Sequence, residues 1–458
     1  MRVGELGYWW RSVGGPPPRR APLPGPAEAD VAIVGAGYTG LWTAYYLKAA
    51  EPSLRVLVLE REHAGFGASG RNGGWVSGFF SGPARAYLRR GDRAGLRALQ
   101  REMLATVDEV GRFLAQRGAE ADFHKGGHLT AALDDAQAQR MREWLRAQRA
   151  RGYGEEDLSE LDAQQLERRL RIRAARGAAF APQVARVHPV KLLLVLAAEV
   201  ERLGVTIHED TPVLELRPHE ARTPAGRVRA RWVIRASEGY TAQLPGYRRT
   251  LAPINSSMIV TEPLPEEVWG EIGWEEAEVL SDEAHVYCYL QRTADGRIAI
   301  GGRGAPYRFG SATDGSGDTA PATIAQLRAR LADMFPAAAT ARVDHAWSGV
   351  LGVSRDWCMS VHLQRETGLG WAGGYVGHGV ASANLAGRTL RDLILARDTE
   401  LTALPWVGRQ PRRWEPEPIR WTAINGLYAL YRRADRSEHR RGRPSIAARL
   451  LDRVSGRE

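Results

Sequence analysis

The chain has 458 residues, of which 44% are hydrophobic and 25% charged, a balance typical of a globular protein large enough for two domains. Its formal net charge is +10, and almost all of the positive charge is arginine, because Lys48, Lys125 and Lys191 are the only lysines. Such a charge suits an anionic partner (nucleic acid, a lipid surface or an acidic substrate) or an arginine-rich composition spread over the surface. No zinc-ligand spacing or aromatic–basic pattern accompanies it, so we expect no nucleic-acid partner.

The expected location is the cytoplasm. Cys288 and Cys358 are the only cysteines and cannot form a disulfide framework, which favours a reducing compartment. No apolar run reaches the roughly 18 residues that a membrane span needs. Arg19 and Arg20 are followed by Ala-Pro-Leu-Pro-Gly-Pro rather than an apolar segment, so no signal peptide is expected.

The first elements predict a strand–helix–strand unit. Residues 1–27 are a Pro/Gly-rich arm whose aromatic residues we expect to pack on the body. Asp30–Val34 is a short apolar run typical of a buried parallel strand, Leu41–Ala50 has helical spacing, and Arg55–Leu59 is a second buried strand.

Helices and strands alternate over the rest of the chain. Amphipathic patterns predict helices at 92–118, 134–151, 190–203 and 382–395. Strand patterns occur at 205–208, 213–216, 229–236, 254–261, 285–290, 297–301 and 369–372. Residues 401–458 are Arg-rich, with two helical patches.

A glycine motif, Gly35-Ala36-Gly37-Tyr38-Thr39-Gly40, joins the first strand to the first helix. Gly35 permits the tight turn, Gly37 lets the backbone approach a pyrophosphate, and Gly40 allows the helix to pack closely on the strand. The phosphates are expected at the helix N-terminus, where Tyr38 and Thr39 stand. Glu60 ends the second strand about 20 residues later, where a carboxylate can bind ribose hydroxyls; it disfavours NADP. The motif therefore predicts a dinucleotide site.

A second glycine-rich loop follows Glu60 directly and favours FAD over NAD, because it leaves room for a ligand that extends beyond the adenosine. The residues that we expect to contact the cofactor there are Arg61, Gly67, Ala68, Ser69, Arg71, Asn72, Gly73 and Gly74.

A third glycine-rich loop lies between the strand at 369–372 and the last long helix. Its N–H groups are placed to face the N1/C2=O edge of a flavin, which becomes negative on reduction. The residues that we expect at the cofactor are Gly374, Tyr375, Gly377, His378 and Gly379.

These three loops together resemble the D-amino-acid-oxidase/glycine-oxidase superfamily of FAD-dependent amine oxidoreductases. The segment Gly65-Phe66-Gly67-Ala68-Ser69-Gly70-Arg71-Asn72-Gly73-Gly74 looks most like the γ-glutamylputrescine oxidoreductase branch. The resemblance covers about residues 28–397 and implies that the backbone of Val213 contacts adenine.

We therefore expect an α/β fold in which a discontinuous, Rossmann-like FAD-binding domain of the GR2 type is combined with a β-rich substrate domain. The FAD-binding domain is assigned to 28–80, 185–245 and 343–397, and the substrate domain to 246–342. Residues 81–184 form a helical insertion, and 398–458 form an Arg-rich C-terminal extension.

Three departures from the resemblance shape the expected chemistry. Gly349 stands where sarcosine oxidases tether FAD through a cysteine, so we expect non-covalent FAD. No lysine follows Lys191, whereas those enzymes use a later lysine to activate oxygen, so O2 or another electron acceptor stays open. Leu351 falls where related enzymes place an arginine on the substrate carboxylate, which favours an amine without a carboxylate at that position.

Candidate catalytic residues are Tyr287, Tyr289 and His378. A strand at 285–290 would place His285, Tyr287 and Tyr289 on one face, where they either cage an alkyl amine or belong to a core. His378 either orients substrate or flavin, or is structural. Arg303 either pairs with an acidic substrate tail or lies at the surface.

The function expected from this combination is oxidation of a primary or secondary amine by hydride transfer to flavin N5, followed by hydrolysis of the imine to an aldehyde. One alternative is a flavin dehydrogenase for another substrate, such as a hydroxy acid, with a membrane or protein electron acceptor. Another is a basic FAD-binding protein that contacts nucleic acid. The C-terminal extension either docks on the body or lies on an anionic membrane.

Overall fold

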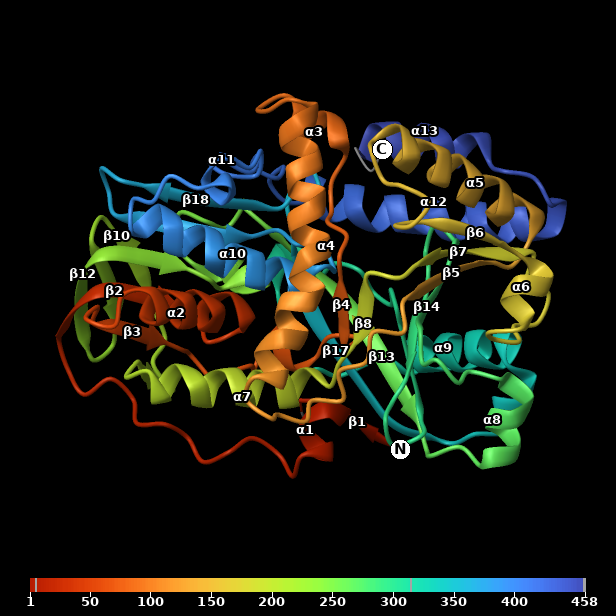
Figure 1. The fold of residues 1–458 in the computed structure, drawn as a ribbon, viewed down its shortest axis with the longest axis horizontal. Helices are drawn as coiled ribbons and strands as arrows, with labels where there is room; N and C mark the ends of the chain where they lie inside the picture. The colour runs from red at the N-terminus through yellow and green to blue at the C-terminus, as the bar shows by residue number, and fades with distance from the viewer. Residues whose placement is uncertain (5, 314, 456–458) are drawn as a thin grey trace.

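The chain is built around two large sheets that lie side by side (Figure 1). The computed structural model describes residues 1–4, 6–313 and 315–455. One is an eight-stranded sheet in which β2 runs parallel to both β3 and β12, and β9 and β19 extend the parallel set. Its strands are β2 (Ala27–Val34), β3 (Val56–Leu59), β9 (Thr206–His208), β10 (Glu215–Arg217), β11 (Glu220–Thr223), β12 (Gly226–Arg235), β18 (Ser360–Gln364) and β19 (Leu369–Gly373).

The second sheet has nine strands, in the order β1-β17-β13-β16-β15-β14-β5-β7-β6, and is mostly antiparallel. Its strands are β1 (Arg2–Val3), β5 (His128–Ala132), β6 (Ser159–Asp162), β7 (Gly177–Ala181), β13 (Ala252–Thr261), β14 (Val279–Asp282), β15 (Tyr289–Arg292), β16 (Ile298–Gly302) and β17 (Val343–Val353). A separate two-stranded ribbon, β4 (Trp75–Ser77) and β8 (Val184–Arg186), lies between the two sheets (Figure 1).

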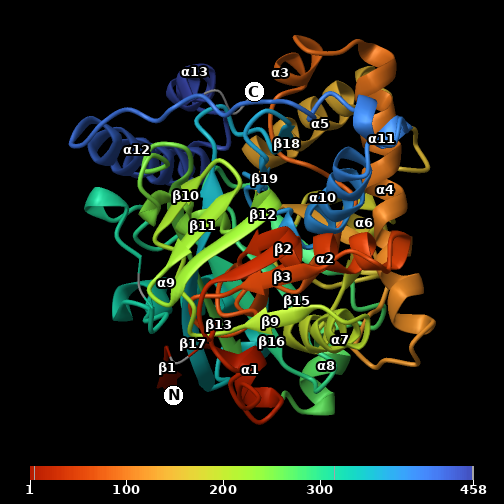
Figure 2. The ribbon, with the colours of Figure 1, turned by 90° about the vertical axis from the view of Figure 1, so that its left-hand side faces the viewer.

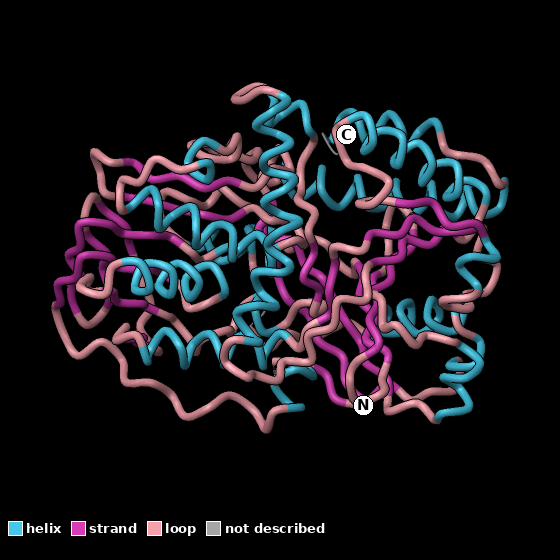
Figure 3. Tube along the Cα trace, viewed as in Figure 1, coloured by secondary structure: helices cyan, strands magenta, loops and turns pink. Residues whose placement is uncertain are grey.

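Helices cover the sheets and enclose two main cores. The larger core packs the eight-stranded sheet against α2 (Tyr38–Ala50), α4 (Arg93–Ala115), α7 (Pro189–Arg202) and α10 (Gly379–Ile394). The second core lies between the nine-stranded sheet and α8 (Glu266–Ile272) and α9 (Pro321–Met334). The remaining helices on the body are α3 (Ala84–Leu88), α5 (Asp135–Ala150) and α6 (Ala163–Glu167), and Figure 3 shows how helices surround the strands.

Local sequence signals set the ends of several helices. Asp92 and Asp134 each accept a hydrogen bond from the backbone N–H three residues later, at 2.7 and 2.9 Å, and so cap α4 and α5. Pro189 is the first residue of α7, as expected from its missing N–H. The α/β fold class predicted from the sequence is confirmed.

Three segments differ from their sequence interpretation. Residues 285–288 are a turn and loop, and β15 begins only at Tyr289, because the chain must reverse between the antiparallel strands β14 and β15. The segment 81–184, expected to be helical, also supplies β5, β6 and β7, which extend the nine-stranded sheet. Residues 343–353, assigned from the sequence to the FAD-binding domain, form β17, which pairs with β13 in the nine-stranded sheet. The division into domains stays a proposal.

Both terminal segments pack against the body. The N-terminal arm forms β1 and a short helix, α1 (Tyr8–Ser12), whose three aromatic side chains are buried. The C-terminal extension forms α11 (Glu400–Ala403), α12 (Ile419–Arg441) and α13 (Ile446–Ser455), and α12 and α13 lie together at one end of the molecule (Figure 2). Among the helices of the described ranges, we find none long and apolar enough to cross a membrane.

Candidate active site

The turn between β2 and α2 brings backbone atoms close together in the way that its glycines allow. Gly35 has a φ of +110°, and a Cβ there would lie 2.7 Å from the carbonyl oxygen of Ala236. A Cβ on Gly40 would overlap the Gly35 carbonyl oxygen. At Gly37 a Cβ would lie 2.9 Å from Ser69 Oγ. The first N–H of α2, that of Tyr38, donates to Ser69 Oγ at 2.9 Å, so a ligand at this helix end meets the other N–H groups of its first turn.

Glu60 stands at the end of β3, beside this turn. Its Oε2 accepts a hydrogen bond from the N–H of Ala36 at 2.7 Å, and its Oε1 accepts one from the N–H of Glu62 at 3.0 Å. Burial raises the pKa of this carboxyl above its usual range, although the two N–H groups oppose the shift. Each oxygen keeps acceptor capacity that ribose hydroxyls can use.

A cleft of about 490 Å³ runs from Glu60 along the N-terminus of α2 to the third glycine-rich loop. Its size and mixed lining suit a cofactor site. The residues predicted to bind the cofactor that line this cleft are Gly35, Gly37, Tyr38, Thr39, Glu60, Arg61, Gly67, Ala68, Ser69, Asn72, Val213, Tyr375, Gly377 and Gly379.

The remaining predicted cofactor residues, Gly40, Arg71, Gly73, Gly74, Gly374 and His378, lie outside that lining. Arg71 is buried, and its guanidinium donates hydrogen bonds to the carbonyl oxygens of Phe66 (2.9 Å), Gly315 (2.8 Å) and Ser348 (3.3 Å). It therefore ties the second glycine-rich loop to the nine-stranded sheet. Our expectation of a phosphate or ribityl contact for Arg71 overlooked these partners, which are distant in the sequence.

Glu238 is a buried residue at the cleft that our sequence reasoning did not single out. Its carboxylate accepts hydrogen bonds from the N–H groups of Gly352 (2.5 Å), Gly374 (2.8 Å) and Tyr375 (3.1 Å). It thereby joins β17 to the third glycine-rich loop. Burial outweighs these bonds and raises the pKa of Glu238 to about 7. The sequence signal was its position just after a strand that ends at the cofactor.

Two smaller cavities meet at His378, directly behind the third glycine-rich loop. The first, which we call the aromatic cavity, measures about 220 Å³ and includes Trp75, Phe79, Phe80, Trp144 and Tyr153 in its lining. The second, the polar cavity, measures about 150 Å³ and is lined by Ser81, Gly82, His285, Val286, Tyr287, Arg303, Trp357, Val376, His378 and Tyr428. Val376 lines both the cleft and the polar cavity, so the loop separates the two spaces.

Burial keeps two of the imidazoles beside these cavities, those of His378 and His128, in the uncharged form near neutral pH. Burial lowers the pKa of His378 to about 4. Burial, with a smaller effect of His378, lowers the pKa of His128 to about 3. His378 Nδ1 lies 3.4 Å from Ser77 Oγ, and His128 Nε2 lies 2.9 Å from Ser281 Oγ. His128 lines the aromatic cavity, and no local pattern had marked it.

Tyr289, in β15 of the nine-stranded sheet, packs against the second glycine-rich loop. A Cβ on Gly73 would lie 2.9 Å from its ring, and a Cβ on Gly301 would overlap the ring from the opposite strand. The Tyr289 hydroxyl lies 2.9 Å from Ser256 Oγ. The ring is thus fitted between two glycines, whereas Tyr287 belongs to the preceding turn and lines the polar cavity.

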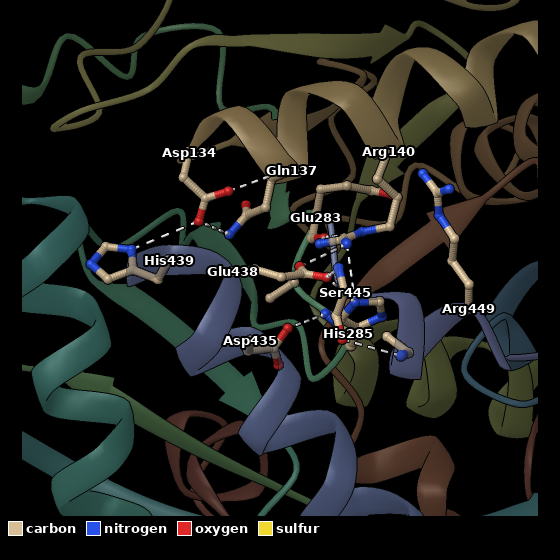
Figure 4. Close-up of polar contacts among 12 residues, drawn as sticks. Asp134, Gln137, Arg140, Glu283, His285, Asp435, Glu438, His439, Ser445 and Arg449 are labelled. Carbon is tan, nitrogen blue, oxygen red and sulfur yellow. Dashed lines mark hydrogen bonds and ion pairs between the residues drawn. The ribbon is translucent and has the colours of Figure 1, made fainter. Parts of the chain in front are cut away.

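The turn that carries Tyr287 is held by the C-terminal extension (Figure 4). Asp435, on α12, accepts hydrogen bonds from the N–H groups of His285 (2.8 Å) and Val286 (3.0 Å). Glu438 lies 2.9 Å from Arg140 Nη1 and 3.1 Å from His285 Nε2. One side-chain nitrogen or oxygen from each of His285, Asp435 and Glu438 could bind a metal ion, since these atoms lie within 4.8 Å of one another. The guanidinium of Arg140 already contacts His285 and Glu438, so we interpret the group as an ion-pair cluster.

The fold and the cleft define a flavin-dependent oxidoreductase. The chain belongs to the FAD dependent oxidoreductase (DAO) family, whose model matches residues 30–393. FAD is therefore its cofactor, and the glycines, Glu60 and the open end of α2 fit that group. The predicted family and cofactor are confirmed.

Individual relatives share about a quarter of its residues. Probable oxidoreductase OrdL of Haemophilus influenzae is 28% identical over 391 residues, which cover 83% of this chain and 86% of that protein. Gamma-glutamylputrescine oxidoreductase of Escherichia coli is 29% identical over 377 residues, which cover 80% of this chain and 83% of that protein. The crystal structure of glycine oxidase from Geobacillus kaustophilus matches with a TM-score of 0.71 at 20% identity, covers 85% of this chain and 100% of that one, and supports the fold.

Proposed function

We propose that this enzyme oxidises a primary or secondary amine, and that the substrate lies across the aromatic and polar cavities beside His378. The observation that carries the proposal is the aromatic cavity itself, because five aromatic side chains in its lining can surround an alkyl amine or its cation. The relative named gamma-glutamylputrescine oxidoreductase supports an amine of that kind.

Two histidines beside the cavities can position an amine, and the linings also contain two arginines, Arg151 in the aromatic cavity and Arg303 in the polar cavity. His378 and His128 are neutral, so they do not repel a cationic amine and can accept a hydrogen bond from it. Trp75 Nε1 is buried and has no hydrogen-bond partner among the described residues, which supports a polar group of the substrate at that place. Leu351 lines the cleft and offers no charge to an α-carboxylate.

Bound in the cleft, FAD supplies a two-electron oxidation in which the carbon that bears the amine gives up hydride, and the imine then hydrolyses to an aldehyde. The chain's own contribution is to hold the amine against the loop at 373–379 and to exclude water through its aromatic walls. Gly374, Tyr375 and Gly352 are fixed by Glu238, which keeps that loop in place.

Cytoplasmic location and non-covalent FAD belong to the same proposal. Both cysteines are free and buried, which supports a reducing compartment. Neither Cys288 nor Cys358 lines the cleft. O2 or another electron acceptor then takes electrons from the reduced cofactor.

The test is an oxygen-free titration of the holoenzyme with alkylamines, diamines, N-acylated diamines, α-amino acids and 2-hydroxy acids. We expect one amine class to bleach the visible flavin band. Bleaching by a 2-hydroxy acid with no response to any amine would contradict the proposal. Trp144→Ala, in the aromatic cavity, should raise KM for the amine several-fold, whereas Trp421→Ala, a 41% exposed residue on α12, should leave KM unchanged.

A further inference from the structure

Arg303 carries a positive charge that no carboxylate of the described chain neutralises. It follows β16 directly and lines the polar cavity. Its Nη1 donates a long hydrogen bond of 3.3 Å to the carbonyl oxygen of Asn255, and its other neighbours are the tyrosines Tyr287, Tyr289 and Tyr428. Some other partly buried arginines pair with carboxylates, as in Arg330–Asp282 (2.5 Å) and Arg388–Glu102 (3.0 Å), whereas Arg71 bonds backbone carbonyl oxygens.

An incompletely paired guanidinium in a cavity wall is a strong anion-binding group. It offers five N–H donors in a planar arrangement that matches a carboxylate, and its removal from water costs free energy unless an anion compensates. The lining of the polar cavity contains no aspartate or glutamate. His285, which also lines this cavity, is already in contact with Glu438 and Arg140.

We propose that Arg303 binds the carboxylate of a substrate in which that carboxylate is well separated from the amine carbon to be oxidised. The inference rests on the proposed function. Arg303 and the flavin loop line the same polar cavity, which shares Val376 with the cleft and His378 with the aromatic cavity. The amine therefore lies at the aromatic end and the carboxylate at the Arg303 end. Leu351, at the cleft, leaves the carbon next to the amine without a charged partner.

The C-terminal extension completes this subsite. Tyr428 of α12 forms part of the same cavity wall as Arg303. Arg432, one turn further along α12, donates hydrogen bonds to the carbonyl oxygens of Arg303 and Gly304. The family match ends at residue 393, so the positioning residues on α12 lie outside the segment that the family model describes.

A binding measurement tests the subsite without any turnover. Calorimetry of the FAD-loaded enzyme with glutarate, a dicarboxylate that cannot be oxidised as an amine, should show binding. Arg303→Gln should weaken that binding about 10- to 100-fold, as expected for the loss of charge-assisted hydrogen bonds. Arg229→Gln, which removes one charge from an exposed position of β12, should not change it. Inorganic phosphate should bind more weakly than glutarate; tighter phosphate binding would contradict a carboxylate site.

A matched pair of amines tests the same residue during turnover. We expect 5-aminopentanoate to have a lower KM than pentylamine, and Arg303→Gln to abolish the difference mainly by raising KM for 5-aminopentanoate. Arg303→Lys, which keeps the charge, should retain part of the preference for 5-aminopentanoate. It keeps the test valid if Arg303→Gln does not fold. Equal KM values for both amines, with glutarate binding unaffected by Arg303→Gln, would overturn the inference while amine oxidation stands. Glutarate binding lost in Arg303→Gln, with no amine bleaching the flavin, would instead reject the proposed function and keep the anion site.

Discussion

The carboxylate of Asp435 accepts a hydrogen bond from the backbone N–H of His285 at 2.8 Å, although the two residues are 150 positions apart in the sequence. The second oxygen accepts the N–H of Val286 at 3.0 Å. Because the next residue, Tyr287, lines the polar cavity, a helix at the end of the chain controls one wall of the substrate site.

Asp435→Asn should loosen that wall. The amide replaces one acceptor oxygen by a donor, which leaves an N–H of the turn unpaired at a cost of about 1–3 kcal/mol. We expect a lower melting temperature and a several-fold higher KM, with FAD content unchanged. Arg433→Gln, at an exposed position of the same helix, is the matched control. Unchanged KM in Asp435→Asn would show that the turn keeps its shape without this contact.

Gly37→Ala should weaken FAD binding. The added Cβ would lie 2.9 Å from Ser69 Oγ, at the point where the backbone must approach the pyrophosphate. We expect about a tenfold higher Kd for FAD, measured by fluorescence of the apoprotein titrated with FAD. Gly25→Ala, whose Cβ would meet nothing within 4 Å, should bind FAD normally. Equal affinities of the two variants for FAD would show that the pyrophosphate does not bind at this turn.

The dinucleotide turn could be predicted from the sequence because its determinants are local. Gly35, Gly40 and Glu60 lie within one strand–helix–strand unit, whose spacing fixes their relative positions. Arg71 could not be placed in the same way, since its partners are Ser348 in β17 of the other sheet and Gly315 in the loop before α9.

The substrate side was less predictable for a related reason. The alternation of His285, Tyr287 and Tyr289 is typical of a strand, but the contacts of α12 favour a turn at 285–286. Arg303 was visible in the sequence, whereas its lack of a carboxylate partner depends on tertiary packing. Glu238 and His128 acquire their roles only when loops from distant parts of the chain converge.

Glu238→Gln should weaken FAD binding, because the amide can no longer accept three N–H groups at once. We expect a Kd for FAD raised about tenfold, since a hydrogen bond to a charged group contributes about 1.5–3 kcal/mol. The matched control is Glu275→Gln, which removes an exposed carboxylate.

The parent enzyme and Glu238→Gln, both without FAD, should also differ in how their free energy of unfolding depends on pH. Because the folded-state pKa of Glu238 is raised from 4.5 to about 7, the folded state binds more protons than the unfolded state between these values. The contribution of Glu238 to stability is therefore fully present below pH 4.5 and is lost as the pH rises through 7. The free energy of unfolding of the parent enzyme should fall relative to Glu238→Gln over that window. A constant difference between them would show that the carboxyl has an ordinary pKa.

FAD should be released intact when the enzyme is denatured. Gly349 lies against the Arg71 side chain, and Cys358 Sγ lies 3.4 Å from the carbonyl oxygen of Asp356 and outside the cleft lining. After acid precipitation we expect all of the flavin in the supernatant, both for the parent and for Cys358→Ala. Flavin retained in the parent pellet but freed in Cys358→Ala would reveal a thioether.

Reoxidation by O2 should be slow compared with reoxidation by an artificial quinone. The three lysines are engaged elsewhere: Lys48 donates to the carbonyl oxygens of Pro52 and Leu54, and Lys125 and Lys191 pair with Asp108 and Asp122. None lines the cleft or either cavity. Stopped-flow mixing of the reduced enzyme with each acceptor measures the two rates, and a faster reaction with O2 would show that oxygen activation here does not need a lysine.

The pairing of β1 with β17 also orders events during synthesis. Arg2 is in register with His345, so the first strand of the chain has no partner until about 340 further residues have been made. At 5–20 residues per second this interval is roughly 20–70 s. Trp9 and Trp10 lie in α1, the helix that follows β1. Trp9 Nε1 donates to the carbonyl oxygen of Asn72, and the Trp10 indole packs against Gly70. Since these tryptophans follow a strand that pairs with β17, we expect the second glycine-rich loop to gain their support late and FAD loading to be completed only after β17 has been made.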